Sequence, residues 1–190
     1  MKILGKSFYA DDPASVAKKL LGKLLVRIYY GKRLSGIIVE TEAYYGREDP
    51  ASRARRGGDL ARVMHGEPGH ALVYGVHRNW LFNIVAHEEG EVGAVLIRAI
   101  EPLEGIEVMK KLRKVNDLRK LTNGPGKLTK ALAIDKSFHK LPVYTTKHGL
   151  WVEDYMDVKE VVVSKRIGVT EDLDIPLRFY VKGNRFVSKP

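Results

Sequence analysis

The stretch Ile37-Ile38-Val39-Glu40-Thr41-Glu42-Ala43-Tyr44-Tyr45-Gly46 decides how the rest of this chain is interpreted. An apolar run leads into alternating acidic and smaller residues, a pattern that predicts a β-strand. Because side chains alternate along a strand, Glu40, Glu42 and Tyr44 share one face, while Val39 and the residues between them face a core. A carboxylate two residues from an aromatic ring can hold a reactive water beside a flat ligand. The alternative is a pair of solvated glutamates at a strand end.

Outward from this strand, the sequence predicts a β-hairpin preceded by a helix. Asp12-Pro13 combines a capping carboxylate with a proline at the first helical position, and Gly22 ends the helix. Residues 23–30 and 33–44 are the expected hairpin strands, with a turn at Gly31-Lys32. Further strands are expected at residues 71–76, 80–86, 93–100, 150–153, 158–166 and 177–181, and further helices at 104–112 and 127–133.

Two glycine-containing segments are candidates for phosphate contact. Residues 46–69 hold five arginines and almost no apolar periodicity, which predicts a long loop that is either a phosphate-binding segment or merely solvated. Asn123-Gly124-Pro125-Gly126 precedes a helix, and its backbone amides can bind phosphate or simply form a turn. The sequence leaves both alternatives open.

Composition narrows the class of protein. The chain has 190 residues, enough for one domain with its own core, and a net charge of +10, which favours nucleic acid as a partner. It has no cysteine, which excludes disulfides, thiolate metal sites and cysteine nucleophiles. The sequence has no apolar run of membrane-spanning length and no signal-peptide pattern. We therefore expect an intracellular protein, cytoplasmic or nucleoid-associated, or nuclear in a eukaryote.

Arg98 is the one charged residue of the apolar run at residues 93–100. An arginine in such a strand is costly to bury unless a carboxylate pairs with it. Glu42 and Glu101 are the two candidates for that partner.

Eight segments, in order along nearly the whole chain, resemble the alkyladenine (3-methyladenine, or 3-methylpurine) DNA glycosylase family of the mammalian and bacterial type. They are residues 20–26 (LLGKLLV), 39–44 (VETEAY), 48–52 (EDPAS), 68–74 (PGHALVY), 96–105 (LIRAIEPLEG), 123–132 (NGPGKLTKAL), 166–169 (RIGV) and 176–181 (PLRFYV). The resemblance implies an α+β fold, with residues 1–190 forming a single glycosylase domain of a curved antiparallel β-sheet and surrounding helices.

The resemblance also implies a reaction in base excision repair. A monofunctional DNA glycosylase flips a damaged purine (alkylated adenine, hypoxanthine or ethenoadenine) out of double-stranded DNA and hydrolyses its N-glycosidic bond, leaving an abasic site. By position, Glu42 is the general base that activates water, Arg98 orients this water, and the backbone carbonyl of Ile167 contacts it. An adjacent guanidinium keeps such a carboxylate ionised. No cofactor or metal is implied, and the protein is expected to act as a monomer.

The resemblance further assigns the residues that hold the base. Tyr44 and Tyr74 match the stacking tyrosines, which suit electron-poor alkylated purines, and Asn83 matches the asparagine that excludes normal guanine. The alternatives are buried tyrosines with satisfied hydroxyls and an ordinary strand amide.

The chain departs from the family pattern at two places. Arg53 stands where the family has a histidine beside the base, and a guanidinium there can stack on the base but would repel a cationic base while tolerating a neutral one. The alternative is that the Arg53 side chain turns to phosphate. The family also has a second tyrosine shortly after the position of Tyr74, which wedges into the duplex, and this chain lacks it. His77 is the first candidate for that wedge and Trp80 the second. The sequence therefore leaves the lesion preference open.

Two other functions compete with this interpretation. The first is a non-catalytic nucleic-acid-binding module on the same fold, which would bind without releasing a base. The second is a metal-dependent hydrolase, whose ligands would be His65, His70, His77 and His87 with Glu40. Their spacing is not that of a known ligand set, which favours isolated histidines.

Overall fold

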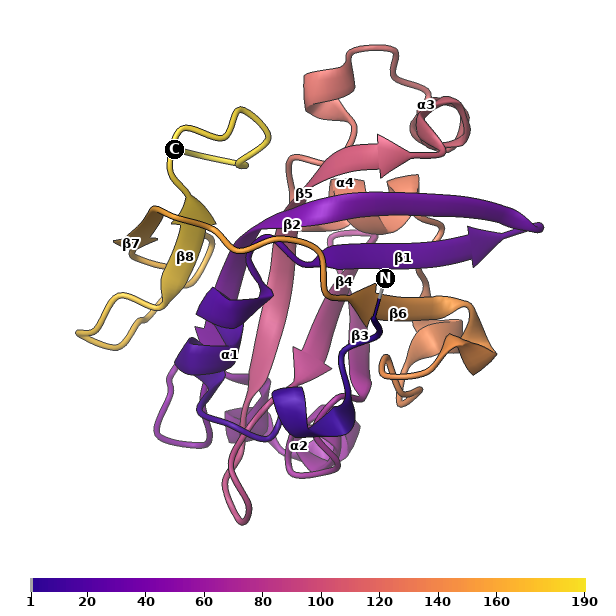
Figure 1. Cartoon of the computed structure of the whole chain (residues 1–190). Helices are drawn as coiled ribbons and strands as arrows, with labels where there is room; N and C mark the ends of the chain where they lie inside the picture. Colours follow the sequence, from indigo (N-terminus) through magenta and orange to yellow (C-terminus); the bar gives the residue numbers. More distant parts are fainter. Residues whose placement is uncertain (1) are drawn as a thin grey trace.

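The chain folds around an eight-stranded sheet in which every pairing is antiparallel, with helices on its surfaces (Figure 1). The structure is a computed structural model and describes residues 2–190. The strand order is β3-β4-β5-β2-β1-β6, with β8 paired to β2 and β7 to β8. The α+β fold expected from the sequence is confirmed.

The strands are β1 (Leu24–Tyr29), β2 (Lys32–Tyr44), β3 (Ala71–Val76), β4 (Asn79–Val85), β5 (Ala94–Glu104), β6 (Leu150–Glu153), β7 (Val161–Ser164) and β8 (Arg178–Val181). The α-helices are α1 (Pro13–Leu20), α2 (Gly58–Met64), α3 (Ile106–Arg113) and α4 (Pro125–Ala131), and short 3₁₀ turns lie at Lys6–Phe8, Arg53–Arg56, Leu118–Lys120, Lys136–Phe138 and Thr146–His148. No helix in residues 2–190 has the length and apolar character to cross a membrane.

Strand β2 is the central element because it pairs with other strands on both of its edges. On one edge it pairs with β5, and on the other it pairs first with β1 and then, around Glu40–Glu42, with β8. The far half of β2 therefore lies between β5 and β8. This is the half that carries the acidic residues.

The pairing of β2 with β5 shifts at three places, and two of these shifts lie on either side of Glu40. Ile38 is opposite Ile100 and Glu40 is opposite Ala99, so Val39 is left out of the ladder. Thr41 is then opposite Ile97, which leaves out Arg98. Such β-bulges bend a strand and redirect side chains, often next to active sites.

The bulge at Val39 corrects one expectation about this strand. Thr41 and Ala43 do face the helix-covered core, where the Thr41 hydroxyl donates to the Ala17 carbonyl of α1. Val39 instead packs with Ala99, Phe186 and Val187, in a separate cluster formed by the C-terminal segment. The strict alternation of a regular strand fails here because one extra residue is inserted into the ladder.

Residues 46–69 are not the unbroken loop that the sequence predicted. They contain a 3₁₀ turn at Arg53–Arg56, capped by the Ser52 hydroxyl, and then helix α2. Only Ala61 and Met64 of α2 are buried. A helix of two turns with two buried residues shows almost no apolar periodicity, which is why the sequence pattern did not reveal it.

Helix α1 ends at Leu20, two residues before the predicted stop, Gly22, which has a φ of +83°. A Cβ at Gly22 would lie 2.5 Å from the Met156 carbonyl oxygen, whereas a Cβ at Gly31, also at positive φ, would meet nothing within 4 Å. Gly22→Ala should therefore reduce the free energy of unfolding by roughly 1–3 kcal/mol more than the matched control Gly31→Ala. Urea denaturation measures both, and equal losses would contradict the close backbone approach.

Candidate active site

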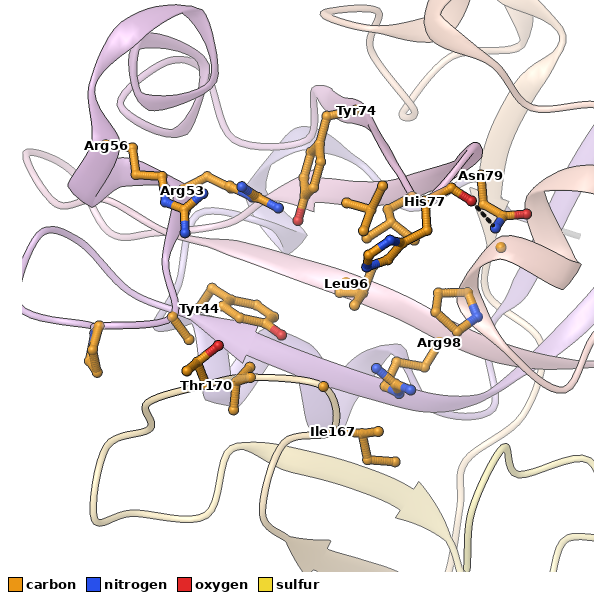
Figure 2. Close-up of a pocket in the computed structure, with 18 of the residues that line it drawn as sticks. Tyr44, Arg53, Arg56, Tyr74, His77, Asn79, Leu96, Arg98, Ile167 and Thr170 are labelled. Carbon is orange, nitrogen blue, oxygen red and sulfur yellow. Dashed lines mark hydrogen bonds between the residues drawn. The ribbon is translucent and has the colours of Figure 1, made fainter.

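A cavity of about 900 Å³ opens where the far end of β2 meets β5, the β3–β4 hairpin and the segment that follows β7 (Figure 2). The lining residues from the sheet are Tyr44, Tyr74, Val76, Asn79, Leu81, Leu96 and Arg98. The others come from the 3₁₀ turn at Arg53–Arg56 and its neighbours, the hairpin turn, the start of α4, and residues 167–171. The cavity thus joins segments that are distant in the sequence.

Glu42 lies directly behind the wall of this cavity and is fully buried. Its Oε1 accepts a hydrogen bond from the Ile167 amide at 2.7 Å and lies 3.2 Å from Nη1 of Arg98. Its Oε2 accepts a hydrogen bond from the Tyr44 hydroxyl at 2.7 Å. The three residues that contact the carboxylate all line the cavity.

Two opposing effects act on the protonation of Glu42. Burial raises the pKa of Glu42, while Arg98, the Ile167 amide and the Tyr44 hydroxyl oppose this rise. The result is a pKa above the ordinary value for glutamate. Arg98 acts in the direction that the sequence predicted, but it does not cancel the effect of burial. A raised pKa makes a carboxylate a stronger proton acceptor near neutral pH.

The partners of Arg98 differ in part from the sequence expectation. Arg98 contacts Glu42, as expected, and its Nε also donates to Oε1 of Glu40 at 3.1 Å. Glu101, the other candidate, accepts a hydrogen bond from Asn184 at 2.7 Å instead. Arg98 therefore lies between two carboxylates of one strand.

Tyr44 and Tyr74 lie on opposite sides of the cavity (Figure 2). Both pack against a small apolar cluster that includes Met64 of α2, so the helix that the sequence did not reveal supports the two rings. The guanidinium of Arg166 lies 4.5 Å from the Tyr44 ring centroid, and that of Arg53 lies 4.8 Å from the Tyr74 centroid. Each aromatic wall thus has an arginine on it, a favourable cation–π geometry.

Arg166 is a site residue that the sequence analysis did not single out. Its guanidinium is fully buried and makes two hydrogen bonds of 2.7 Å to Asp49, two to Oδ1 of Asp172, and one to the Ala43 carbonyl. These bonds fix the segment after β7 to the start of the arginine-rich segment. Ile167, the next residue, is thereby held beside Glu42.

The structure brings seven of the nine predicted site residues to the cavity or its wall: Glu42, Arg98, Ile167, Tyr44, Tyr74, Arg53 and His77. Asn83 does not line the cavity; it is buried in β4 and donates to the Leu72 carbonyl. Trp80 also lies outside the lining residues. At Ile167 the contact with Glu42 is made by the amide, whereas the sequence expectation concerned the carbonyl.

His77 occupies the tip of the β3–β4 hairpin, with a φ of +48° beside Arg78 at +63°. Two consecutive positive φ values define a tight two-residue turn. His77 is exposed and lines the cavity. Its position suits a residue that projects towards a ligand lying across the cavity mouth.

Arginines also surround the cavity at its outer edge. Arg53, Arg55 and Arg56 line it, and only a loose 3.8 Å contact joins Arg55 to Glu171. Pro125 and Gly126, at the start of α4, line the same space. Both segments that the sequence marked for phosphate contact thus lie at the cavity.

The histidines of the metal-dependent alternative are not brought together. Both ring nitrogens of His87 lie within 2.8 Å of backbone carbonyl oxygens, and Nδ1 of His65 lies 2.7 Å from the Ala61 carbonyl oxygen. Within residues 2–190 no three histidine, aspartate or glutamate side chains form a group that could hold a metal ion.

A cavity walled by two tyrosines, with a buried carboxylate behind it and arginines at its edge, is typical of enzymes that act on a nucleobase. Comparison with known proteins gives the family. The model of the methylpurine-DNA glycosylase family matches residues 7–185. The chain therefore belongs to this family, and the predicted class, a DNA glycosylase and hydrolase of base excision repair, is confirmed.

Curated relatives match this chain over nearly their whole length. A protein of Aeropyrum pernix is 48% identical over 192 residues, covering 99% of this chain and 94% of the relative. A protein of Carboxydothermus hydrogenoformans is 46% identical over 197 residues, covering 98% of this chain and 99% of the relative. Both carry the name "Putative 3-methyladenine DNA glycosylase".

The Asp49–Arg166 pair should contribute strongly to stability. Burial raises the pKa of Asp49, but the hydrogen bonds from Arg166 and from backbone amides lower it by a larger amount. The pKa of Asp49 therefore lies below its ordinary value. The carboxylate therefore stabilises the fold above about pH 4 and loses this effect as the pH falls through its folded-state pKa.

Asp49→Asn should reduce the free energy of unfolding at pH 7 by about 3 kcal/mol, because the substitution leaves Arg166 partly unpaired. In this variant the free energy of unfolding should also fall less steeply in acid, because the titrating carboxylate is gone. Glu160→Gln, which breaks the exposed pair with Lys182, is the control and should change little. Denaturant titrations between pH 3 and pH 7 measure both. Equal effects of the two variants would contradict the assignment.

Proposed function

We propose that this chain acts as a single glycosylase domain and a monomer that removes damaged purines from double-stranded DNA by hydrolysis, without a metal or cofactor. The observation that carries the proposal is Glu42, a buried carboxylate held by three donors directly behind an aromatic cavity. Water attacks the anomeric carbon as the purine leaves, and an abasic site remains. The proposed enzyme is monofunctional.

Glu42 is proposed as the general base. Oε1 is engaged by both Ile167 and Arg98, but Oε2 has one donor, the Tyr44 hydroxyl. A carboxylate oxygen can accept a second hydrogen bond, so Oε2 is the atom proposed to bind and deprotonate water. Arg98, which lines the cavity and contacts Glu42, is proposed to orient this water.

The damaged base is proposed to lie between Tyr44 and Tyr74. Their rings stand on opposite sides of the cavity, and aromatic stacking accepts any flat base. The arginines at the cavity edge and the start of α4 would contact the DNA backbone. His77, exposed at the hairpin tip, is proposed as the wedge that fills the space left by the flipped base, in preference to Trp80.

The proposed substrates are alkylated adenine, hypoxanthine and ethenoadenine. The names of the relatives from Aeropyrum pernix and Carboxydothermus hydrogenoformans support 3-methyladenine. In this chain Arg53 stacks on the Tyr74 ring inside the cavity, and Arg166 covers Tyr44. The charge of Arg166 is balanced by two carboxylates, whereas Arg53 lines the cavity. We therefore propose that Arg53 disfavours a cationic base and that neutral lesions are removed more readily.

Glu42→Gln should abolish excision and keep lesion binding, because glutamine keeps the shape but cannot take a proton from water. The measurement is single-turnover release of hypoxanthine or alkylated adenine from a duplex, with binding to the same duplex measured separately. Binding should weaken steeply as salt is raised, since phosphate contacts release counterions. Excision at the wild-type rate by this variant would refute the mechanism, and a wild-type protein that binds but releases no base would support a non-catalytic binding module.

Arg53→Gln should raise the excision of a cationic lesion relative to a neutral one, by roughly tenfold for the loss of one nearby positive charge. The control is Arg56→Gln, which removes another arginine of the cavity edge that is not stacked on a tyrosine. Single-turnover rates on 7-methylguanine and hypoxanthine duplexes give the ratio. The same ratio in both variants would show that Arg53 does not select the base.

A further inference from the structure

Four charged side chains meet in the buried interior behind the cavity: Glu40, Glu42, Arg98 and Arg178. Glu40 and Glu42 are fully buried, and both arginines are at most 7% exposed. Oε1 of Glu40 lies 3.1 Å from Nε of Arg98 and 2.7 Å from Nε of Arg178. The two positive and two negative charges balance, as burial requires.

Glu40 is held from a third direction by the C-terminal segment. The backbone amide of Ser188 donates to Oε2 of Glu40 at 2.6 Å, and the Ser188 hydroxyl donates to Oε1 at 2.9 Å. Phe186 and Val187 pack against the bulged Val39 and so hold Ser188 in place. Glu40 is therefore fixed by residues from β5, β8 and the C-terminal segment.

Glu40 has no role in the chemistry proposed above, and it does not line the cavity. Its link to the site is Arg98, whose Nε donates to Glu40 while Nη1 contacts Glu42. Because Arg98 falls in a β-bulge, the ladder does not pair it with a residue of β2. The direction of its guanidinium consequently depends on the carboxylates that it meets.

We infer that Glu40 is a positioning residue, which Arg178 and Ser188 hold in place and which fixes the guanidinium of Arg98 against Glu42. This inference rests on the proposed role of Glu42 as the base. Glu40 does not touch the reacting atoms. It acts through Arg98, and the C-terminal segment contributes by engaging both oxygens of Glu40.

The charges around Glu42 should set the pH dependence of excision. The charged and titratable groups facing Glu42 are Glu40 and Tyr44 from β2, Arg98 from β5, and Arg178, its cross-strand partner on β8. Burial raises the pKa of Glu42, and the charge of Glu40 adds to that rise, while Arg98 lowers it. Removal of Glu40 should therefore lower this pKa. Removal of Arg178 should raise it, because a cation is lost and Glu40 then competes for Arg98.

The test compares single-turnover excision against pH for the wild type, Glu40→Gln and Arg178→Gln. Since a general base must be deprotonated, the rate rises with pH through the pKa of Glu42. Glu40→Gln should displace this rise to lower pH by about 1 unit, and Arg178→Gln should displace it to higher pH by a similar amount. Both should lower the maximal rate roughly tenfold, because Arg98 is less well placed. Opposite displacements cannot result from a general loss of packing.

The matched control is Glu101→Gln, which removes a carboxylate that holds the same C-terminal segment through Asn184, away from Arg98. Its pH profile should equal that of the wild type. If either buried variant fails to fold, Ser188→Ala provides the test instead. It removes one donor from Glu40 and should displace the rise in rate to higher pH by a smaller amount.

Unchanged profiles in the variants of Glu40, Arg178 and Ser188, or displacements in the same direction, would overturn the inference. They would do so while Glu42→Gln remains inactive. Wild-type excision by Glu42→Gln would instead refute the proposed function itself, so the two failures are distinguishable.

Discussion

Two carboxylates, buried two residues apart on one strand, impose the main constraint on this structure. Glu40 and Glu42 are both fully buried, and like charges so close together require compensation from within the protein. Arg98 from β5 contacts both, and Arg178 from β8 contacts Glu40. The position of β2 between β5 and β8 is thus an electrostatic requirement as well as a feature of the sheet. The C-terminal segment completes it with the two donors of Ser188.

The two glutamates have different surroundings because they stand at different positions along β2, although both are fully buried. The donors to Glu40 come from β5, β8 and the C-terminal segment, so its charge joins these elements to β2, and Arg98 links it to the cavity wall. Glu42 is one step nearer the cavity, and its partners Tyr44, Arg98 and Ile167 form the cavity wall. The same strand therefore carries one carboxylate suited to structure and one suited to chemistry.

The walls of the cavity follow from packing that is remote from the chemistry. Tyr44 and Tyr74 pack against a cluster completed by Met64 of α2, and Arg166 joins the Tyr44 ring to Asp49 and Asp172. Arginine serves in two ways in this protein. Arg166 and Arg98 are buried and paired with carboxylates, whereas Arg53, Arg55 and Arg56 surround the cavity, where DNA phosphates can reach them.

The sequence by itself determined the strands of the sheet, the first helix, the nucleic-acid class and the need of Arg98 for a carboxylate partner, with Glu42 and Glu101 as candidates. Each of these is expressed locally, as alternation, as a capping proline and glycine, as net charge, or as a lone arginine in an apolar strand. Only the tertiary structure decided that Arg98 also meets Glu40, that Arg166 supports Tyr44, and that Asn83 lies outside the cavity lining. These depend on two β-bulges and on contacts between residues more than a hundred positions apart, such as Ala43 with Arg166. A shift of one residue in register changes which side chains meet, and no local pattern in the sequence encodes it.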